Sequence, residues 1–335
     1  MNSIAPALKV LIREGMNQSE PIKLRKALQE IDRDSRRYGW TDDIIETIPP
    51  EWQHRVACAR LQMGHLDWRG FQWRIPRDGH DNFPFPKWKL GLPVYPHSPE
   101  CKEPEKVGNL LIYAEQGLGD QLMFAQAFDE VRPYAENVTI EVEPRLEKIF
   151  KRRFPYFHIH PIVDIRDFEW ATGFDAKVLM GDVVARFRRS KESFTSFEMT
   201  ADPEMIKKWS HLKGVGCSFH GRQADLDPKI FGKDWINLQY GEYKSDLFTP
   251  DIDLTKDIED IFGILANLVR VVTVPNTLAH MAGVLNIPCD VIATPGAGEV
   301  NNSVNWRWGM PADRKMVWHK SITIYRNVKQ YESSQ

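Results

Sequence analysis

A short glycine-rich segment, 115–120 (EQGLGD), holds residues that could bind a ligand and move a proton. It lies between an apolar run at 109–114, typical of a strand, and a stretch from 121 to about 131 that is typical of a helix. Glycines at such a junction let a ligand approach backbone N–H groups, and the helix N-terminus favours an anion. The candidate ligand-binding residues of this segment are Gln116, Gly117 and Gly119.

Asp120 follows the glycines directly and admits two interpretations. As the N-cap of the helix, its carboxylate would accept hydrogen bonds from the free N–H groups of the first turn. Facing a cleft, the same carboxylate could take a proton from an attacking hydroxyl. The residue pattern alone leaves both interpretations open.

The glycine segment can also be compared with the turn that binds dinucleotides. That fingerprint needs a third glycine where this chain has Leu122, so the match fails. An acid does follow about twenty residues on, as Glu141 or Glu143. An NAD-dependent dehydrogenase therefore stays a minor alternative, and it predicts nicotinamide nucleotide binding at Gly117–Gly119.

A second strand–turn–helix passage occupies 274–283 (VPNTLAHMAG). Pro275 cannot continue a sheet ladder easily and ends the strand. Asn276 or Thr277 is expected to cap the helix, whose free amides could hold a diphosphate. His280 lies about one helical turn inside, where it is either a ligand-binding histidine or a structural one.

Polar residues follow an expected strand at 214–218. This strand runs into Ser218 and His220, and the loop after it carries Lys229 and Lys233. The phosphates of a nucleotide bind beyond the carboxyl ends of parallel strands, where such groups gather. The alternative for the two lysines is a solvated loop.

Strands alternate with helices in two series, which predicts parallel, doubly wound sheets. Strands are expected at 109–114, 138–142, 158–163, 177–180, 214–218, 235–238, 270–274 and 290–293. Helices are expected at 121–131, 144–153, 203–212, 258–268 and 277–285. The first series covers 107–202 and the second 203–335. The chain is thus expected to be α/β, with two Rossmann-like domains facing one another across a cleft.

The part of the chain before these series has a different character. Residues 1–75 carry apolar positions at helical spacing, which predicts a short helical extension, degenerate and repeat-like around 59–70. Prolines dominate 76–106, so this stretch is expected to be an extended connector. An aromatic cluster of the extension could stack on nucleic acid bases, but packing against the following domain is favoured. This cluster consists of Trp68, Phe71 and Trp73.

Composition excludes several classes of protein. The 335 residues include 44 Lys and Arg and 46 Asp and Glu, and the net charge of −2 disfavours a protein that coats nucleic acid. No apolar run approaches the roughly 20 residues of a membrane span, and the N-terminus lacks the pattern of a signal peptide. Four widely spaced cysteines argue against a zinc site or a disulfide framework, and they indicate a cytoplasmic protein.

Several segments, taken in order, match one family of enzymes. They are 64–74 (GHLDWRGFQWR), 85–92, 111–124 (LIYAEQGLGDQLMF), 174–180 (FDAKVLM), 235–241 (WINLQYG), 271–283, 305–308 and 324–326. With them the chain resembles the bacterial and phage glycosyltransferases that follow tetratricopeptide repeats. These are relatives of the lipopolysaccharide heptosyltransferases and, more remotely, of protein O-GlcNAc transferase. The resemblance covers roughly residues 55–327, and 111–124 is its most specific part.

This resemblance implies a GT-B fold whose C-terminal domain holds most of a donor nucleotide sugar. It implies an inverting transfer with Asp120 at the position of the base. It also implies that the helix from Asn276 to His280 binds the diphosphate and that Glu242 lies near a ribose-binding acid. The residues that fall near the family's phosphate-binding loop are Ser218, His220 and Lys229.

The chain departs from the family at Pro275, where the family usually has an aspartate. Any role of that acid is therefore either missing or moved to Asn276. This difference affects which donor is bound and whether the chain is active. The chain also lacks the full repeat array that usually precedes this domain, so its choice of acceptor can differ.

The leading hypothesis is a metal-independent, inverting glycosyltransferase that uses a nucleoside-diphosphate sugar and no further cofactor. Fixed hydrogen-bond donors can stabilise the leaving diphosphate in place of a metal. Asp225 and Asp227 have the spacing of a metal-binding acid pair but lie in a hydrophilic loop. The alternative is a degenerate, non-catalytic module that binds a glycan or a protein. The acceptor is expected to be a protein or a glycan rather than nucleic acid, in the cytoplasm of a bacterium or of a phage-infected host.

Overall fold

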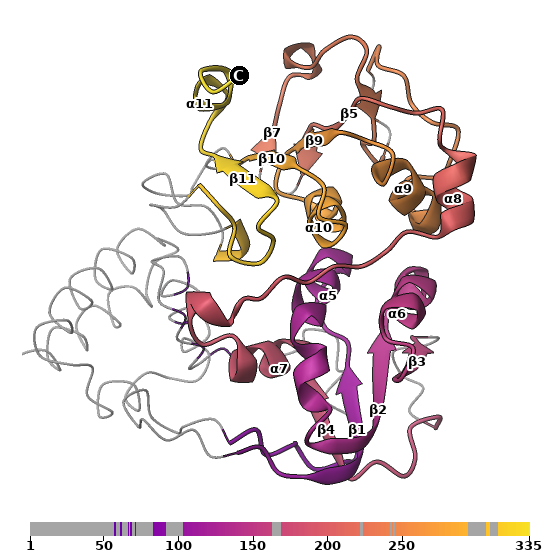
Figure 1. Ribbon diagram of the computed structural model, residues 1–335, viewed down its shortest axis with the longest axis vertical. Coiled ribbons are helices and arrows are strands. Elements are labelled where there is room, and N and C mark those ends of the chain that lie inside the picture. Colours follow the sequence, from indigo (N-terminus) through magenta and orange to yellow (C-terminus); the bar gives the residue numbers. More distant parts are fainter. Residues whose placement is uncertain are drawn as a thin grey trace, which may run out of the picture.

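The computed structural model contains two separate parallel sheets (Figure 1). It describes residues 57, 61, 66, 68, 71, 83–91, 103–162, 169–221, 224–241, 243, 245–293, 306–308 and 314–335. The alternation of strands and helices confirms the expected α/β class with parallel sheets. Most of the predicted extension and connector lies outside the described residues, and the domain boundaries stay predictions.

The first sheet has four strands in the order β3-β2-β1-β4, and all of its pairings are parallel. The strands are β1 (Val107–Tyr113), β2 (Ala135–Val142), β3 (His158–Pro161) and β4 (Ala176–Leu179). Leu110 of the central strand β1 lies opposite Val138 on one side and Ala176 on the other. From Leu110 onward β1 is buried, as expected of a central parallel strand covered on both faces. All four strands predicted for this half are confirmed, with shifted ends.

Helical segments flank the first sheet. They are α5 (Leu118–Phe124), the 3-10 segments η3 (Ala125–Val131) and η4 (Pro144–Leu146), α6 (Glu147–Arg153), α7 (Met180–Phe187) and η5 (Lys191–Ser193). The helix predicted for 144–153 is confirmed as η4 followed by α6. The helix predicted for 121–131 begins earlier than expected, at Leu118 in α5, and continues after Phe124 as η3, which ends at the predicted Val131. The sequence analysis missed α7.

The second sheet has five strands in the order β11-β10-β9-β5-β8, again with parallel pairings only. The strands are β5 (Val215–Ser218), β8 (Ile236–Asn237), β9 (Arg270–Thr273), β10 (Cys289–Ile292) and β11 (Ile322–Tyr325). A small antiparallel hairpin of β6 (His220–Gly221) and β7 (Ala224–Asp225) follows β5. The four strands predicted for this half are confirmed, and β11 was missed.

The helical segments of the second half include two that are largely buried. They are α8 (Pro203–Lys208), η6 (Pro228–Ile230), α9 (Ile258–Leu265), α10 (Thr277–Val284), η7 (Trp306–Trp308) and α11 (Val328–Glu332). Helices α9 and α10 turn apolar side chains into the core. No helix within the described residues combines the length and apolar character needed to cross a membrane.

The connectivity of each sheet reverses direction at one strand. From β1 the chain passes to β2 on one side and returns later to β4 on the other side. From β5 it passes to β8 and then returns to β9, so that Ser218 lies opposite Thr273. Ligands of open α/β sheets bind beyond the carboxyl ends of the strands at such switch points. The glycine segment follows β1, and α10 follows β9, so the topology positions both motifs at these points.

The two halves share one hydrophobic core. Its buried residues come from both sheets and from the few described residues before position 75. Helix α5 packs against α10, which lies directly above it in Figure 1. Arg152 of α6 adds an ion pair to Glu259 of α9, with 2.9 Å between Nη2 and Oε2.

The described aromatic residues of the extension pack against the rest of the chain. Trp68 is buried, and its Nε1 donates a hydrogen bond of 2.7 Å to the backbone carbonyl of Arg188. Its ring meets Phe71 at 5.0 Å and Trp318 at 5.8 Å between centroids, both edge-on. For Trp68 and Phe71 this geometry supports the packing interpretation over base stacking; Trp73 lies outside the described residues.

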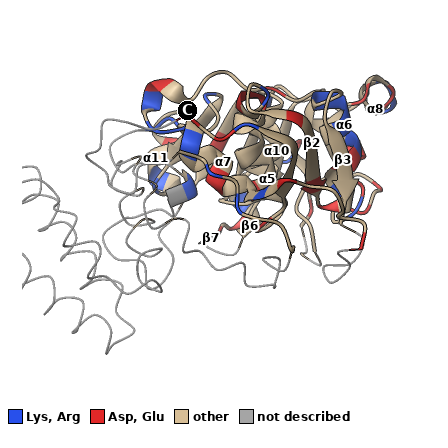
Figure 2. Cartoon of the chain, turned by 90° about the horizontal axis from the view of Figure 1, so that it is seen from below, with Lys and Arg blue, Asp and Glu red and all other residues tan. Residues whose placement is uncertain are grey.

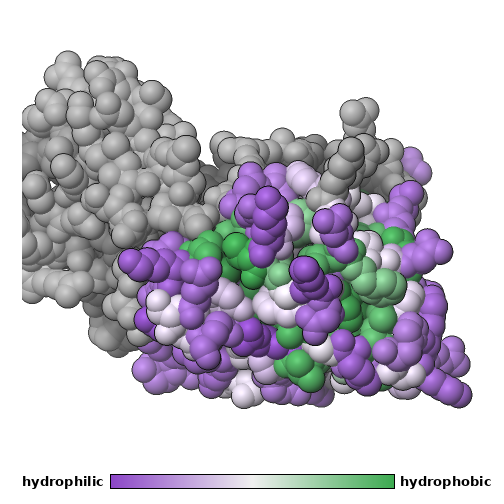
Figure 3. All heavy atoms as spheres, turned by 90° about the horizontal axis from the view of Figure 1, so that it is seen from above, coloured by the Kyte–Doolittle hydropathy of each residue, from purple (hydrophilic) through white to green (hydrophobic). Residues whose placement is uncertain are grey.

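Charged residues of both signs are interspersed over the described elements, as the net charge of −2 leads one to expect (Figure 2). The face seen from above is mostly hydrophilic, with smaller hydrophobic areas between the protruding side chains (Figure 3).

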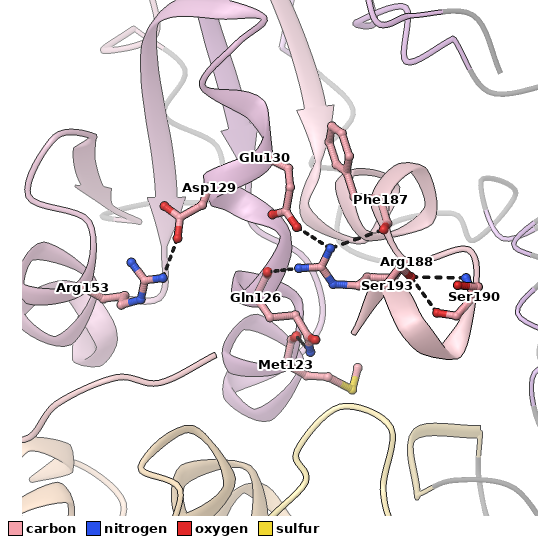
Figure 4. A network of polar contacts seen from close by, with 9 residues as sticks. All are labelled: Met123, Gln126, Asp129, Glu130, Arg153, Phe187, Arg188, Ser190 and Ser193. Carbon is pink, nitrogen blue, oxygen red and sulfur yellow. Dashed lines mark hydrogen bonds and ion pairs between the residues drawn. The ribbon is translucent and has the colours of Figure 1, made fainter. Parts of the chain in front are cut away.

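Arg188 is a buried cation that ties the end of α7 to η3 (Figure 4). Its guanidinium donates to the backbone carbonyl of Gln126 and forms an ion pair of 2.5 Å with Glu130. Its side chain is 2% exposed, so these partners replace the water that the guanidinium loses on folding. The pair therefore holds together the layer that carries α5.

Replacing Arg188 with Met is expected to lower the free energy of unfolding by about 3 kcal/mol, because Glu130 and the Gln126 carbonyl lose their cation. Urea unfolding at pH 7 measures the change. The control is Lys151→Met, which breaks the exposed pair with Glu147 and should cost less than about 0.5 kcal/mol. Equal losses in the two variants would contradict the structural role of Arg188.

Candidate functional site

The glycine segment enters α5 earlier than its residue pattern indicates. Gln116 adopts a left-handed φ of 61°, and Gly117 is the N-cap, so Asp120 lies within the first helical turn. Asp120 is therefore not the N-cap residue itself, but from the third helical position its carboxylate accepts from the N–H of the N-cap Gly117, as in a capping box. Among the described residues, Oδ2 accepts one hydrogen bond, a long one of 3.4 Å from the Gly117 N–H.

Asp120 instead forms an ion pair with a residue that the sequence analysis missed. Arg307 of η7 donates through Nε to Asp120 Oδ1 at 2.5 Å. The Asp120 side chain is 15% exposed and that of Arg307 is 22% exposed, so both charges are largely withdrawn from water. The only signal in the sequence was the segment 305–308, in which Arg307 stands between two tryptophans.

The N-terminus of α10 is capped by Asn276, one of the two predicted candidates. Its Oδ1 accepts a hydrogen bond of 3.1 Å from the Leu278 N–H. Its Nδ2 donates to Ser218 Oγ at 2.9 Å, which ties the helix to the end of β5. Thr277 is then the first residue of the helix and is half-buried.

Gln239 organises the loop after β5, although the sequence analysis did not single it out. Its buried Oε1 accepts three hydrogen bonds, at 2.7 Å from Ser218 Oγ, 3.0 Å from the Phe219 N–H and 2.8 Å from the His220 N–H. Ser218 and Asn276 are thus linked through hydrogen bonds to Gln239. The conformation of this loop therefore depends on Gln239, which follows β8, the neighbour of β5 in the sheet.

The backbone of His220 belongs to that network, whereas its side chain and Lys229 have other contacts. His220 contacts Asp225 through Nδ1, and its ring lies 4.3 Å from the ring of Tyr243. Lys229 is exposed on η6, where its N–H donates to Asp227 Oδ1. Glu242 lies outside the described residues.

The two carboxylates considered as metal ligands have other contacts in the described structure. Asp225 contacts His220, and Asp227 caps η6. The described residues contain no group of three or more His, Cys, Asp and Glu side chains that could hold a metal ion.

His280 is buried in α10 beside the glycine segment. Burial lowers its pKa well below the usual value, and His319 and Arg307 act in the same direction, so the ring is neutral at pH 7. Its Nδ1 lies 3.4 Å from His319 Nε2, and its ring is 4.7 Å from the ring of Trp308. A neutral His280 can offer a ligand a hydrogen bond but no positive charge.

The closest approach of the two motifs is at Gly119. A Cβ placed there would lie 2.8 Å from His280 Cδ2 and 3.5 Å from Thr277 Cα. Asp120 is the next residue, so its backbone lies beside the first turn of α10. The structure thus brings together the glycine segment, the α10 N-terminus and, through Asn276, the end of β5.

The acids considered for dinucleotide binding are already engaged. Glu141 is buried and accepts a hydrogen bond of 3.1 Å from the Ala114 N–H. Glu143 accepts hydrogen bonds from the backbone N–H and the Nε of Arg145. In this arrangement neither carboxylate is left open to a ribose, which weighs against the dehydrogenase alternative.

No protein-family model matches the chain. Protein FlbA of Caulobacter vibrioides is 24% identical over 234 residues, which are 53% of this chain and 38% of FlbA. The chain therefore spans well under half the length of this curated relative.

The chain aligns in part with solved structures of glycosyltransferases, including the following two. A glycosyl transferase of family 9 from Veillonella parvula has a TM-score of 0.46 and 9% identity, over 68% of this chain and 88% of its own. The ADP-heptose lipopolysaccharide heptosyltransferase II of E. coli has a TM-score of 0.47 and 8% identity, over 66% and 91%. At this level of similarity the function has to be argued from the residues of the chain itself.

Gly119→Ala is expected to lower the free energy of unfolding by about 1–3 kcal/mol, because the new methyl group would overlap His280. The control is Gly117→Ala, where a Cβ meets nothing within 4 Å and φ is −91°. That variant should lose less than about 1 kcal/mol. Urea unfolding compares the two, and an equal loss would contradict the tight contact between α5 and α10.

Burial raises the pKa of Glu141 to about 7 from the usual 4.5, so folding favours the protonated form. This stabilisation is complete below pH 4.5 and is lost as the pH rises through 7. Glu141→Gln should therefore raise the free energy of unfolding by about 1–3 kcal/mol at pH 8 and change it little at pH 4. Urea unfolding at both pH values tests this, with the exposed Glu136→Gln of the same strand as control. A pH-independent difference would contradict it.

Proposed function

We propose that the chain is an inverting, metal-independent glycosyltransferase with a GT-B arrangement of two Rossmann-like domains. Its donor is a nucleoside-diphosphate sugar, and its acceptor is a hydroxyl or amide of a protein or glycan. One observation carries the proposal, namely the contact of Gly119 with Thr277 and His280. This contact positions an acid beside a helix N-terminus that comes from the other sheet.

Asp120 is the base in this proposal. Its carboxylate accepts the proton of the acceptor as the new bond to the anomeric carbon forms. Arg307 holds one carboxylate oxygen at 2.5 Å, which fixes the orientation of the group. Within the described part of the chain, Oδ2 has just the 3.4 Å contact with the Gly117 N–H, and we assign it as the oxygen that receives the proton.

The leaving nucleoside diphosphate is held at α10. The N-terminal amides of a helix lack partners within the helix, and the helix dipole favours a negative charge there. His280 contributes as a neutral hydrogen-bond donor, since burial keeps it uncharged. Lys229 would supply positive charge from the exposed segment η6.

The rest of the donor site is proposed from the resemblance to glycosyltransferases that follow tetratricopeptide repeats. Ser218 and His220 belong to the phosphate-binding loop, which Gln239 holds in place. Glu242 is assigned to the ribose. The donor-binding backbone of the glycine segment is that of Gln116, Gly117 and Gly119.

A second candidate is a non-catalytic module that binds a glycan or a protein. Pro275 favours it, because the related enzymes usually have an aspartate at this position. The ion pair between Asp120 and Arg307 also favours it, since a structural ion pair accounts for an acid at this position without any role in proton transfer. The two candidates differ in whether the chain binds a nucleotide sugar and turns it over.

Asp120→Asn is expected to abolish sugar transfer, a loss of at least about 100-fold, and to keep donor affinity within about threefold. The physical reason is that an amide cannot accept the proton, whereas α10 and its phosphate contacts are unchanged. The donor is first chosen by thermal shift with ADP-, UDP- and GDP-sugars, because a bound ligand stabilises the folded state. Transfer or donor hydrolysis and calorimetry then give turnover and affinity.

The control is Asp129→Asn in η3, another ion-paired aspartate, which contacts Arg153 and is not part of the proposed site. It should retain turnover. Full turnover in Asp120→Asn would remove Asp120 from the mechanism. Binding of no nucleotide sugar by the wild-type chain would favour the non-catalytic module.

A further inference from the structure

Two buried histidines meet behind the proposed diphosphate site. His280 of α10 and His319 are each 3% exposed, and their closest nitrogens, Nδ1 and Nε2, lie 3.4 Å apart. The His319 ring lies directly on α10, since a Cβ on Gly283 would come within 2.4 Å of its Cγ. The pair is therefore held tightly by its surroundings.

Burial keeps both rings neutral, because it lowers the pKa of His319 to about 3 and that of His280 well below its usual value. A neutral imidazole carries one N–H, so one ring donates and the other accepts at this contact. Two arrangements are possible. They differ in which nitrogen of His280 is left to face a ligand.

The second nitrogen of His319 decides between the arrangements. His319 Nδ1 is buried and has no hydrogen-bond partner among the described residues. If His280 donated through Nδ1, His319 would carry its proton on this buried Nδ1 as an unsatisfied donor. If His319 donates through Nε2, Nδ1 is a bare acceptor, which is the less costly defect. The second arrangement leaves the proton of His280 on Nε2.

The edge of the His280 ring that carries Cδ2 faces α5. Its Cδ2, which is bonded to Nε2, is the ring atom nearest to Gly119. Within the described residues His280 forms its hydrogen bond through Nδ1 alone. Its Nε2–H can therefore donate a hydrogen bond to an oxygen atom of a ligand bound at the junction of α5 and α10.

We propose that His319 is a positioning residue, which fixes His280 in the tautomer that presents Nε2–H to the leaving diphosphate. Without this contact, the His280 proton can move to Nδ1, and Nε2 then repels a phosphate oxygen. The position of the proton depends only on the histidine pair, whereas its use in diphosphate binding rests on the proposed function.

Long-range ¹H–¹⁵N correlation spectra of the full chain with ¹⁵N-labelled histidine test the tautomer at pH 7. His280→Gln identifies the His280 signals. We expect the wild-type His280 proton on Nε2 and its partial transfer to Nδ1 in His319→Phe, which keeps a ring but has no donor. His319→Gln can donate through its amide and should restore the wild-type pattern. The control Ser321→Ala removes a nearby hydroxyl that has no partner among the described residues, and it should change nothing.

Calorimetry with ADP, UDP and GDP provides the second measurement. For the diphosphate that binds best, His319→Phe should weaken affinity about tenfold, and His319→Gln should recover most of it. A wild-type proton on Nδ1 of His280, or an unchanged His280 in His319→Phe, would overturn the inference. If His319→Phe does not fold, the wild-type and His319→Gln spectra decide. If no diphosphate binds, the proposed function is refuted, whereas the spectra still test the tautomer that His319 imposes on His280.

Discussion

The close contact between α5 and α10 at Gly119 is the constraint on which the site depends. No side chain fits there, since a Cβ would lie 2.8 Å from His280. The contact explains why α5 begins at Leu118 although Gly119 in its first turn has low helix propensity, because packing against α10 offsets that preference. It also puts Asp120 beside Thr277, so an acid from one sheet adjoins a helix N-terminus from the other.

A second set of contacts gives this junction its polar surroundings. Gln239 holds the loop after β5, and Asn276 joins that loop to the start of α10. Both residues satisfy backbone or hydroxyl groups that would otherwise be buried without partners. The local backbone around the proposed phosphates is therefore shaped before any ligand arrives, which lowers the entropy cost of binding.

Features that depend on neighbouring residues could be predicted from the sequence, and those that depend on distant ones could not. Apolar runs identified eight of the nine strands in the two sheets, and the order Pro275-Asn276-Thr277 limited the cap of α10 to two residues, because strand burial and capping are local. The start of α5 was misplaced because a tertiary contact determines it. Arg307 reaches Asp120 across 187 residues, and no local pattern indicates that pairing. His319 and Gln239 were missed for the same reason.

Trp318 links several parts of the chain at once. Its ring meets Phe124 of α5 at 6.3 Å, Phe194 at 5.1 Å and Trp68 at 5.8 Å between centroids. It comes from the segment next to β11 of the second sheet, yet all three partners precede α8 in the chain. Trp318 is 4% exposed, so drawing α5 away from the segment before β11 would bring a large apolar surface into contact with water. Burial of this one side chain therefore opposes separation of the segments that meet on it.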